Sequence, residues 1–203
     1  MKRVWMKSWL CVSLLLATQG RSAQVAPQKA STSAPPSPSI SHRVNETLLA
    51  GLRPGRDTLA AAEKRFKAKS LAERQESGIK EWRDECSGRS IRLELDAKSM
   101  IQSITITTLG FQEGKCGEKR ADFLDSKNWV TGVGLRIGDS QDRIVDFYGE
   151  PNSSGPAAKN GQELELLFYQ FDWAGSDVPQ VMEVLCARDT GRVVEITLAF
   201  PIL

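Results

Sequence analysis

Histidine is nearly absent from this chain. His42 is the single histidine among 203 residues, and neither an acid nor a cysteine lies beside it. A Ser-His-Asp or Cys-His catalytic arrangement needs an imidazole held by the fold, and an ordinary zinc site needs a cluster of His or Cys. The sequence therefore predicts no catalytic residue, no metal site and no cofactor.

Paired carboxylates in the pattern of a hydrolase are also scarce. Glu163 and Glu165 share one face of an expected strand in "ELELLF". Two carboxylates could cleave a glycosidic bond, but neighbouring acids on the solvent face of a strand are usually only hydrated. A carboxylate-based hydrolase is therefore kept as an alternative, beside a carrier for a small ligand.

The only hint of a membrane segment is the apolar run at residues 10–17, which follows Lys2, Arg3 and Lys7. This run has about half the ~20 residues that a membrane span needs. A positive start, a short apolar run and small residues are typical of a secretory signal. We expect a signal peptide at residues 1–23, an exported chain in the periplasm or outside the cell, and no stable membrane span after cleavage.

The chain after the leader has no excess of basic residues. The whole chain carries a formal net charge of +2, and removal of the basic leader makes it slightly negative. Nucleic acid is therefore not expected as a partner. Residues 24–43, with "VAPQKASTSAPPSPS", contain too few apolar side chains to offset the entropy of ordering, and predict a disordered tether.

Two related segments begin the two halves of the remaining chain. "GLRPGRDTLAAAEKRFKA" spans residues 51–68, and "GLRIGDSQDRIVDFYGEP" spans residues 134–151. Each has a glycine turn, then Asp57 or Thr58, or Asp139 or Ser140, as a candidate helix cap, then a short helical pattern. In the second segment a glycine and a proline stop the helix. The motif residues are Gly55, Thr58, Gly138, Ser140, Gly149 and Pro151.

Strand patterns follow each helical pattern. "SIRLELD" and "MIQSITITT" alternate in the first half, and "ELELLFYQF", "VMEVLCAR" and "VVEITLAF" follow in the second. We expect an α+β fold of two tandem units, each a helix plus a three-stranded antiparallel meander, with their sheets side by side. The boundaries are 44–116 for the first repeat, 117–133 for a linker and 134–203 for the second repeat, with "SSGPAAKNG" as an insertion.

The segment "LRIGDSQDRIVDFYGEP" resembles the opening of SmpA/OmlA-type small outer-membrane proteins. In that pattern a glycine, a spacer and Ser or Thr precede a short helix that ends in glycine and proline. The tandem arrangement is similar to the β-lactamase-inhibitor protein, in which two such units form a concave sheet. The resemblance implies that fold and a tendency to bind other proteins.

Three cysteines follow the leader in a chain expected to enter an oxidising compartment. Cys86 and Cys116 lie in turn-like surroundings on either side of two expected strands, and we predict a disulfide between them. Closing this loop would stabilise the fold by roughly 3 to 4 kcal/mol in the chain-entropy model. Cys186 lies inside an expected strand, where it reads as a small apolar residue.

Aromatic residues are the remaining candidates for a binding surface. Tyr169, Phe171 and Trp173 alternate in "LLFYQFDW", and Trp82 lies near another strand. If the row of leucines in that strand packs under a helix, the aromatic row faces outward and forms an open recognition surface. In the inverse arrangement the aromatic row is core and the leucine row contributes to an interface.

The sequence as a whole favours an exported, non-enzymatic binding module. Its expected partner is an unknown protein in the cell envelope or outside the cell. The observations behind this hypothesis are the leader, the tether, the lack of a fold-held histidine and the resemblance given above.

Overall fold

A computed structural model describes residues 44–67, 78–84, 86–110, 122–171 and 180–200. All of them lie in the second of two compact units of the chain, Ser41–Leu203. The predicted signal peptide at 1–23 and the tether at 24–43 lie outside the described residues. In the described part of the chain, no helix combines the length and apolarity that crossing a membrane requires.

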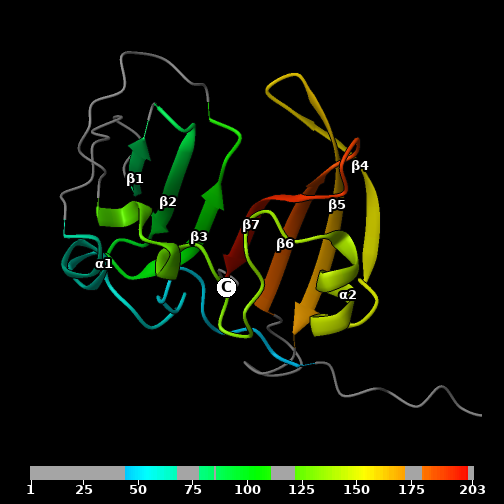
Figure 1. The fold of residues 1–203 in the computed structure, drawn as a ribbon. Coiled ribbons are helices and arrows are strands. Elements are labelled where there is room, and N and C mark those ends of the chain that lie inside the picture. The colour runs from blue at the N-terminus through cyan, green and yellow to red at the C-terminus, as the bar shows by residue number, and fades with distance from the viewer. Residues whose placement is uncertain (1–43, 68–77, 85, 111–121, 172–179, 201–203) are drawn as a thin grey trace, which may run out of the picture. The chain divides into compact units, whose positions relative to one another are not determined.

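A single antiparallel sheet of seven strands dominates the fold (Figure 1), in the order β1-β2-β3-β7-β6-β5-β4. The expected α+β fold of two tandem helix-plus-meander units with their sheets side by side is therefore wrong, because the protein is mainly β and forms one continuous sheet. The strands are β1 Ile79–Asp84, β2 Arg89–Leu95, β3 Ile101–Thr107, β4 Ser153–Lys159, β5 Gln162–Phe171, β6 Gln180–Ala187 and β7 Val193–Ala199.

Strands β3 and β7 join the two halves of the sheet. They pair antiparallel, with Ile104 opposite Leu198 and Ile106 opposite Ile196. All four of these side chains are fully buried. Because both strands carry β-branched and aliphatic residues at matching positions, the central pair buries one apolar face along its length.

Strand β4 was not expected. Its sequence, SSGPAAK, contains no β-branched or aromatic residue, and the sequence pattern suggested an insertion there. It is nevertheless paired along its whole length with β5, from Ser153 opposite Phe168 to Lys159 opposite Gln162. Pairing with a strongly β-forming neighbour has overridden local propensity, and Pro156 is tolerated because β4 is an edge strand.

The two α-helices of the described residues pack on the same face of the sheet. α1 is Leu59–Phe66 and α2 is Gln141–Tyr148, and two 3₁₀ turns, η1 Asp122–Leu124 and η2 Ser126–Asn128, lie between them in the chain. The last residue of each helix reaches an aromatic ring of the sheet. The ring centroids are 4.9 Å apart for Phe66 and Trp82, and 5.8 Å apart for Tyr148 and Tyr169.

Each helix begins from a glycine turn docked on the sheet. The N–H of Gly55 donates to the carbonyl of Ile101 at 2.6 Å, and the N–H of Gly138 donates to the carbonyl of Val193 at 2.8 Å. Both glycines have positive φ, 72° and 93°, which favours glycine at these positions. The turns therefore fix where each helix starts relative to the first residue of β3 or β7.

The expected helix caps have a different role. Neither Thr58 nor Ser140 makes a side-chain capping hydrogen bond. Asp57 accepts instead from the N–H of Arg53, and Asp139 from the N–H of Arg136, each at 2.8 Å. The carboxylates thus close the glycine turns rather than cap the helices.

The two helices end differently. α2 ends at Tyr148, followed by Gly149 with φ 73° and then Pro151. α1 is followed by Lys67, which adopts φ 51° in the left-handed region without being glycine. The second helix therefore has the less strained stop.

Candidate functional site: the uncovered face of the sheet

The aromatic residues expected to form a recognition surface lie in the core. Tyr169, Phe171 and Trp82 are 0%, 2% and 1% exposed. The hydroxyl of Tyr169 donates to the carbonyl of Gly149 at 3.1 Å, and both rings of β5 pack against Tyr148 of α2. The expectation of an aromatic open face is therefore wrong for these three residues, because the helices cover the face that carries them. Trp173 lies outside the described residues.

The opposite face of the sheet is the one that the described helices leave uncovered. Its side chains follow from the strand registers, which place Leu166 and Phe168 of β5 on the same side as Val181 and Leu185 of β6. These four apolar side chains are partly buried. The leucine row is therefore on the outer face and the aromatic row is in the core. This is the inverse of the arrangement in which the aromatic row forms the recognition surface.

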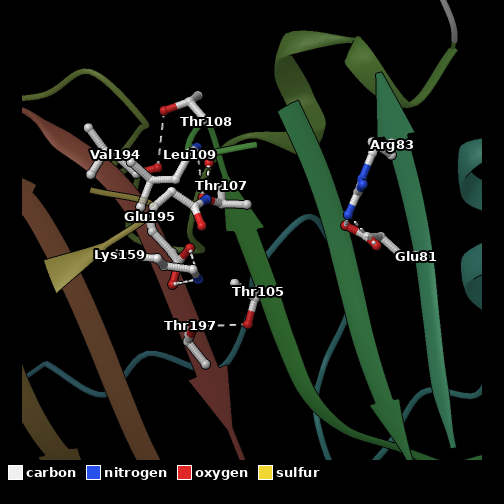
Figure 2. A network of polar contacts seen from close by, with 11 residues as sticks. Glu81, Arg83, Thr105, Thr107, Thr108, Leu109, Lys159, Val194, Glu195 and Thr197 are labelled. Atoms are coloured by element: carbon white, nitrogen blue, oxygen red, sulfur yellow. Dashed lines mark hydrogen bonds and ion pairs between the residues drawn. The ribbon is translucent and has the colours of Figure 1, made fainter. Parts of the chain in front are cut away.

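A row of hydroxyl groups runs beside these apolar residues at the centre of the sheet (Figure 2). Thr105 of β3 and Thr197 of β7 stand opposite each other, with their hydroxyl oxygens 2.9 Å apart. Thr107 lies two residues along β3 and accepts from the N–H of Leu109 at 3.0 Å. The hydroxyl of Thr108 donates to the carbonyl of Val194 at 3.2 Å. Hydroxyl groups thus link the two halves of the sheet.

Glu195 is the buried acid of this face. Its side chain is 8% exposed, and the ammonium of Lys159 donates to its two oxygens at 2.8 and 2.6 Å. Glu195 belongs to β7 and Lys159 to β4, and strands β6 and β5 lie between them in the sheet. The β4–β5 hairpin therefore bends over the outer face to make this contact, and Figure 2 shows the pair beside the threonine row.

The tip of the same hairpin also reaches the end of β3. The amide of Asn160 donates to the carbonyl of Leu109. Leu109 and Leu164 are 5% and 0% exposed, yet neither belongs to the core cluster under the helices. Both leucines are therefore buried outside the core under the helices. We call the Lys159–Glu195 and Asn160–Leu109 contacts the hairpin clasp.

The charges along β1 and β2 on the outer face largely neutralise one another. Arg83 pairs with Glu81 at 3.1 Å, and Arg92 pairs with Glu94 at 3.1 Å. Each pair lies two residues apart on one strand, so its members share a face. Exposed pairs of this kind contribute little stability, and their mutual neutralisation leaves no strong field on this part of the surface.

A second buried acid, Glu46, was missed by the sequence analysis. It is 1% exposed. One carboxylate oxygen accepts from the N–H groups of Thr47, Leu48 and Gly132 at 2.8 to 3.0 Å. The other accepts from the N–H of Val133 at 3.0 Å and from the hydroxyl of Tyr148 at 2.6 Å. Glu46 therefore ties the first described residues to the start of the second half.

The surroundings of Glu46 indicate a structural role. Burial, and then the charge of Glu46, raise the pKa of Tyr148 far above its usual value, so this hydroxyl remains a proton donor. A Cβ added to Gly132 would lie 2.6 Å from a Glu46 oxygen, so the turn must approach the carboxylate closely. Every oxygen of Glu46 is already engaged, which leaves no free lone pair directed at a substrate.

The acids proposed as a hydrolytic pair do not share a buried site. The side chain of Glu163 is 83% exposed and lies 3.9 Å from Arg188. Glu165 stands opposite Cys186 on the helix-covered face. Burial, followed by the charge of Glu165, raises the pKa of the Cys186 thiol to about 11. The arrangement offers neither a carboxylate pair in a cleft nor a reactive thiolate.

The predicted disulfide between Cys86 and Cys116 can be checked only at Cys86. Cys86 is disulfide-bonded and Cys186 is free. Cys116 lies outside the described residues, so the Cys86–Cys116 pairing stays a prediction. The described ranges contain no group of three or more His, Cys, Asp or Glu side chains that could hold a metal ion.

Comparisons with known proteins add little to this geometry. No protein-family model matches the chain, and no curated protein matches it. The chain is similar to the crystal structure of a DUF4309 family protein, YjgB, from Bacillus subtilis. The two share 10% sequence identity with a TM-score of 0.42, over 74% of this chain and 83% of that chain. A likeness this distant supports no argument about function.

Proposed function

We propose that this chain is an exported, non-enzymatic binding protein that engages another protein through the outer face of its sheet. The observation that carries the proposal is the row of Leu166, Phe168, Val181 and Leu185, which are only partly buried on a face that no described helix covers. Apolar side chains flanked by polar groups are the usual composition of a protein interface. The leader at residues 1–23 supports export.

The chemistry of the face defines the kind of partner. Glu195 is already paired with Lys159, and the ion pairs on β1 and β2 satisfy their own members. Glu183, exposed between Val181 and Leu185 and opposite Phe168, has no ion pair among the described residues. The partner is therefore a protein surface that offers apolar side chains and one donor or cation for this carboxylate. We expect its association to depend only weakly on salt, because little Coulomb attraction is available to screen.

Site-specific photo-cross-linking tests the proposal. A photoreactive amino acid at Phe168 reports on the outer face, and the same amino acid at Ser154 is the matched control. Ser154 belongs to the same hairpin, is exposed, and stands opposite Leu167 on the helix side of the sheet. Both variants are illuminated in the envelope and secreted fractions of the source organism.

A discrete protein adduct formed from position 168 and absent from position 154 supports the proposal. Substitution of Val181 by Lys, on the adjacent strand, must then abolish the adduct. Equal labelling from both positions, or no adduct from well-folded protein, contradicts it. An adduct of twice the chain mass would identify a second copy of this chain as the occupant, and would contradict the proposed binding of a different protein.

A further inference from the structure

A separate pocket lies on the helix side of the sheet. It has a volume of about 170 Å³ and is lined by Arg89, Ser126, Trp129, Arg136 and Ile137. Arg89 is the first residue of β2, Ser126 begins η2, and Arg136 and Ile137 belong to the glycine turn before α2. The start of β2 and a segment about 40 residues later, from η2 to the glycine turn, therefore converge on it.

The charge of the pocket lining is one-sided. Among the described residues, two arginines line it and no acid does. Within the described ranges, neither Arg89 nor Arg136 takes part in an ion pair with a carboxylate. An arginine guanidinium presents donors in a planar fork that matches the oxygens of a carboxylate or phosphate.

The acids near these arginines are occupied by other groups. Asp139 accepts from the backbone N–H of Arg136. Asp125 accepts from the N–H of Lys127 and also pairs with the Lys127 ammonium at 3.1 Å. Neither carboxylate lines the pocket, so both guanidinium groups remain the charged groups of its wall.

The pocket also has a rigid aromatic wall. Trp129 is 6% exposed, and its indole N–H donates to the carbonyl of Phe123 at 3.0 Å, which fixes the ring. The guanidinium carbon of Arg89 lies 5.5 Å from the centre of this ring. A flanking bridge between Val130 and Arg136 holds the two neighbouring segments together. The lining is thus positioned before any ligand arrives.

We propose that this pocket binds a small organic anion, with its carboxylate or phosphate held by Arg89 and Arg136 and its apolar part against Trp129 and Ile137. The volume sets the size, since a cavity of about 150 Å³ admits benzene. A ligand the size of benzoate or phenyl phosphate therefore fits. This site is independent of the proposed protein-binding face, because it lies on the other side of the sheet.

Titration of the ¹⁵N-labelled full chain with benzoate, phenyl phosphate and neutral benzamide tests the proposal. The indole N–H signal of Trp129, assigned with a Trp129→Phe variant, reports binding. We expect both anions to shift this signal at millimolar concentration and benzamide to leave it unchanged. The anion that binds more tightly identifies the preferred head group. Equal binding of benzamide, or no shift with either anion, would overturn the proposal.

Substitutions locate the anion. Arg136→Gln keeps the stacking of Arg89 on Trp129 and should weaken binding about tenfold, the loss of one charged hydrogen bond. Arg89→Gln should weaken it at least as much. Arg143→Gln is the matched control, because Arg143 also stacks on an aromatic ring, 4.2 Å from the centre of Phe147, but does not line the pocket. Unchanged affinity in Arg136→Gln, or an equal loss in Arg143→Gln, would contradict the assignment.

Discussion

The helices of the two halves of the protein begin in the same way and end differently. In both halves an aspartate closes a glycine turn, and backbone hydrogen bonds dock that turn on the first residue of β3 or β7. The last helical residue then differs. Phe66 ends α1 with a purely apolar contact to Trp82, whereas Tyr148 ends α2 with a hydroxyl bound to Glu46.

The difference shows how a local motif acquires a long-range role. The glycine turns need only neighbouring residues and the next strand pair to form. A single hydroxyl at the end of α2 links that helix to a carboxylate 102 residues earlier. The β4–β5 hairpin adds a second connection in the opposite direction, since its tip contacts Leu109 after β3. The second half therefore holds the first in place.

Removing the buried acid should have the largest effect. Glu46→Ala leaves three backbone N–H groups without their acceptor and removes one of two partners from the N–H of Gly132 and the hydroxyl of Tyr148. It should lower the free energy of unfolding by about 3 to 5 kcal/mol. The control Asp146→Ala, at an exposed position of α2, should change it by less than about 0.5 kcal/mol. Urea unfolding of both variants measures the difference. A loss below about 1 kcal/mol for Glu46→Ala would show that the two halves do not depend on this network.

Exchanging the two helix-terminal rings should be the next largest change. Tyr148→Phe removes the donor to Glu46 and should cost about 1 to 3 kcal/mol. Phe66→Tyr, at a position with no exposed area, should also destabilise by about 1 to 3 kcal/mol because it overpacks the core. Thermal unfolding checks both variants. If Tyr148→Phe left the melting temperature unchanged, the hydroxyl at the end of α2 would add no stability beyond the apolar contact that ends α1.

The hairpin clasp should contribute less. Lys159→Met leaves the nearly buried Glu195 without its cation and should cost about 1.5 kcal/mol. Lys127→Met is the control, because Lys127 forms an exposed pair with Asp125 and should lose almost nothing. Hydrogen exchange in β4 and β5 should accelerate only in the Lys159 variant. Equal exchange in the two variants would mean that the hairpin is held by its strand pairing alone.

The cysteines give the smallest expected difference. Cys86 does not titrate, whereas burial raises the pKa of the Cys186 thiol to about 11 from an ordinary value of 9.0. Between about pH 9 and 11 the unfolded chain loses this proton while the folded chain retains it, so stability falls as pH rises, by about 1 kcal/mol per pH unit. Unfolding measured across this range should show a shallower fall in Cys186→Ala. A fall of the same slope would assign the pH dependence to other groups, such as Tyr148.

The sequence pattern predicted individual strands better than their assembly. Alternation in "SIRLELD" matches β2, and "VVEITLA" is β7. The pattern did not predict that β3 pairs with β7, because strand pairing between distant segments leaves no local signal. It also missed β4, whose Ser, Gly, Pro and Ala residues become a strand only through β5.

The candidate sites show the same limit. A period of two correctly groups Tyr169 with Phe171, but it does not say which face a helix will cover. Glu46 could not be found from its neighbours, because Gly132, Val133 and Tyr148 lie 86 to 102 residues away. A buried acid carries no periodic signature. The pocket arginines were equally hidden, since one begins β2 and the other lies in the glycine turn before α2.

The Glu46 network also sets the order in which the chain can complete its fold during synthesis. Residue 46 leaves the ribosome long before Gly132 and Tyr148, so its carboxylate must remain hydrated until those partners emerge. A nascent chain that ends before Tyr148 lacks the groups that make burial of this charge favourable. The first half therefore cannot reach its final state alone. The chain stays incompletely folded, and accessible to chaperones and export factors, until most of it has been made.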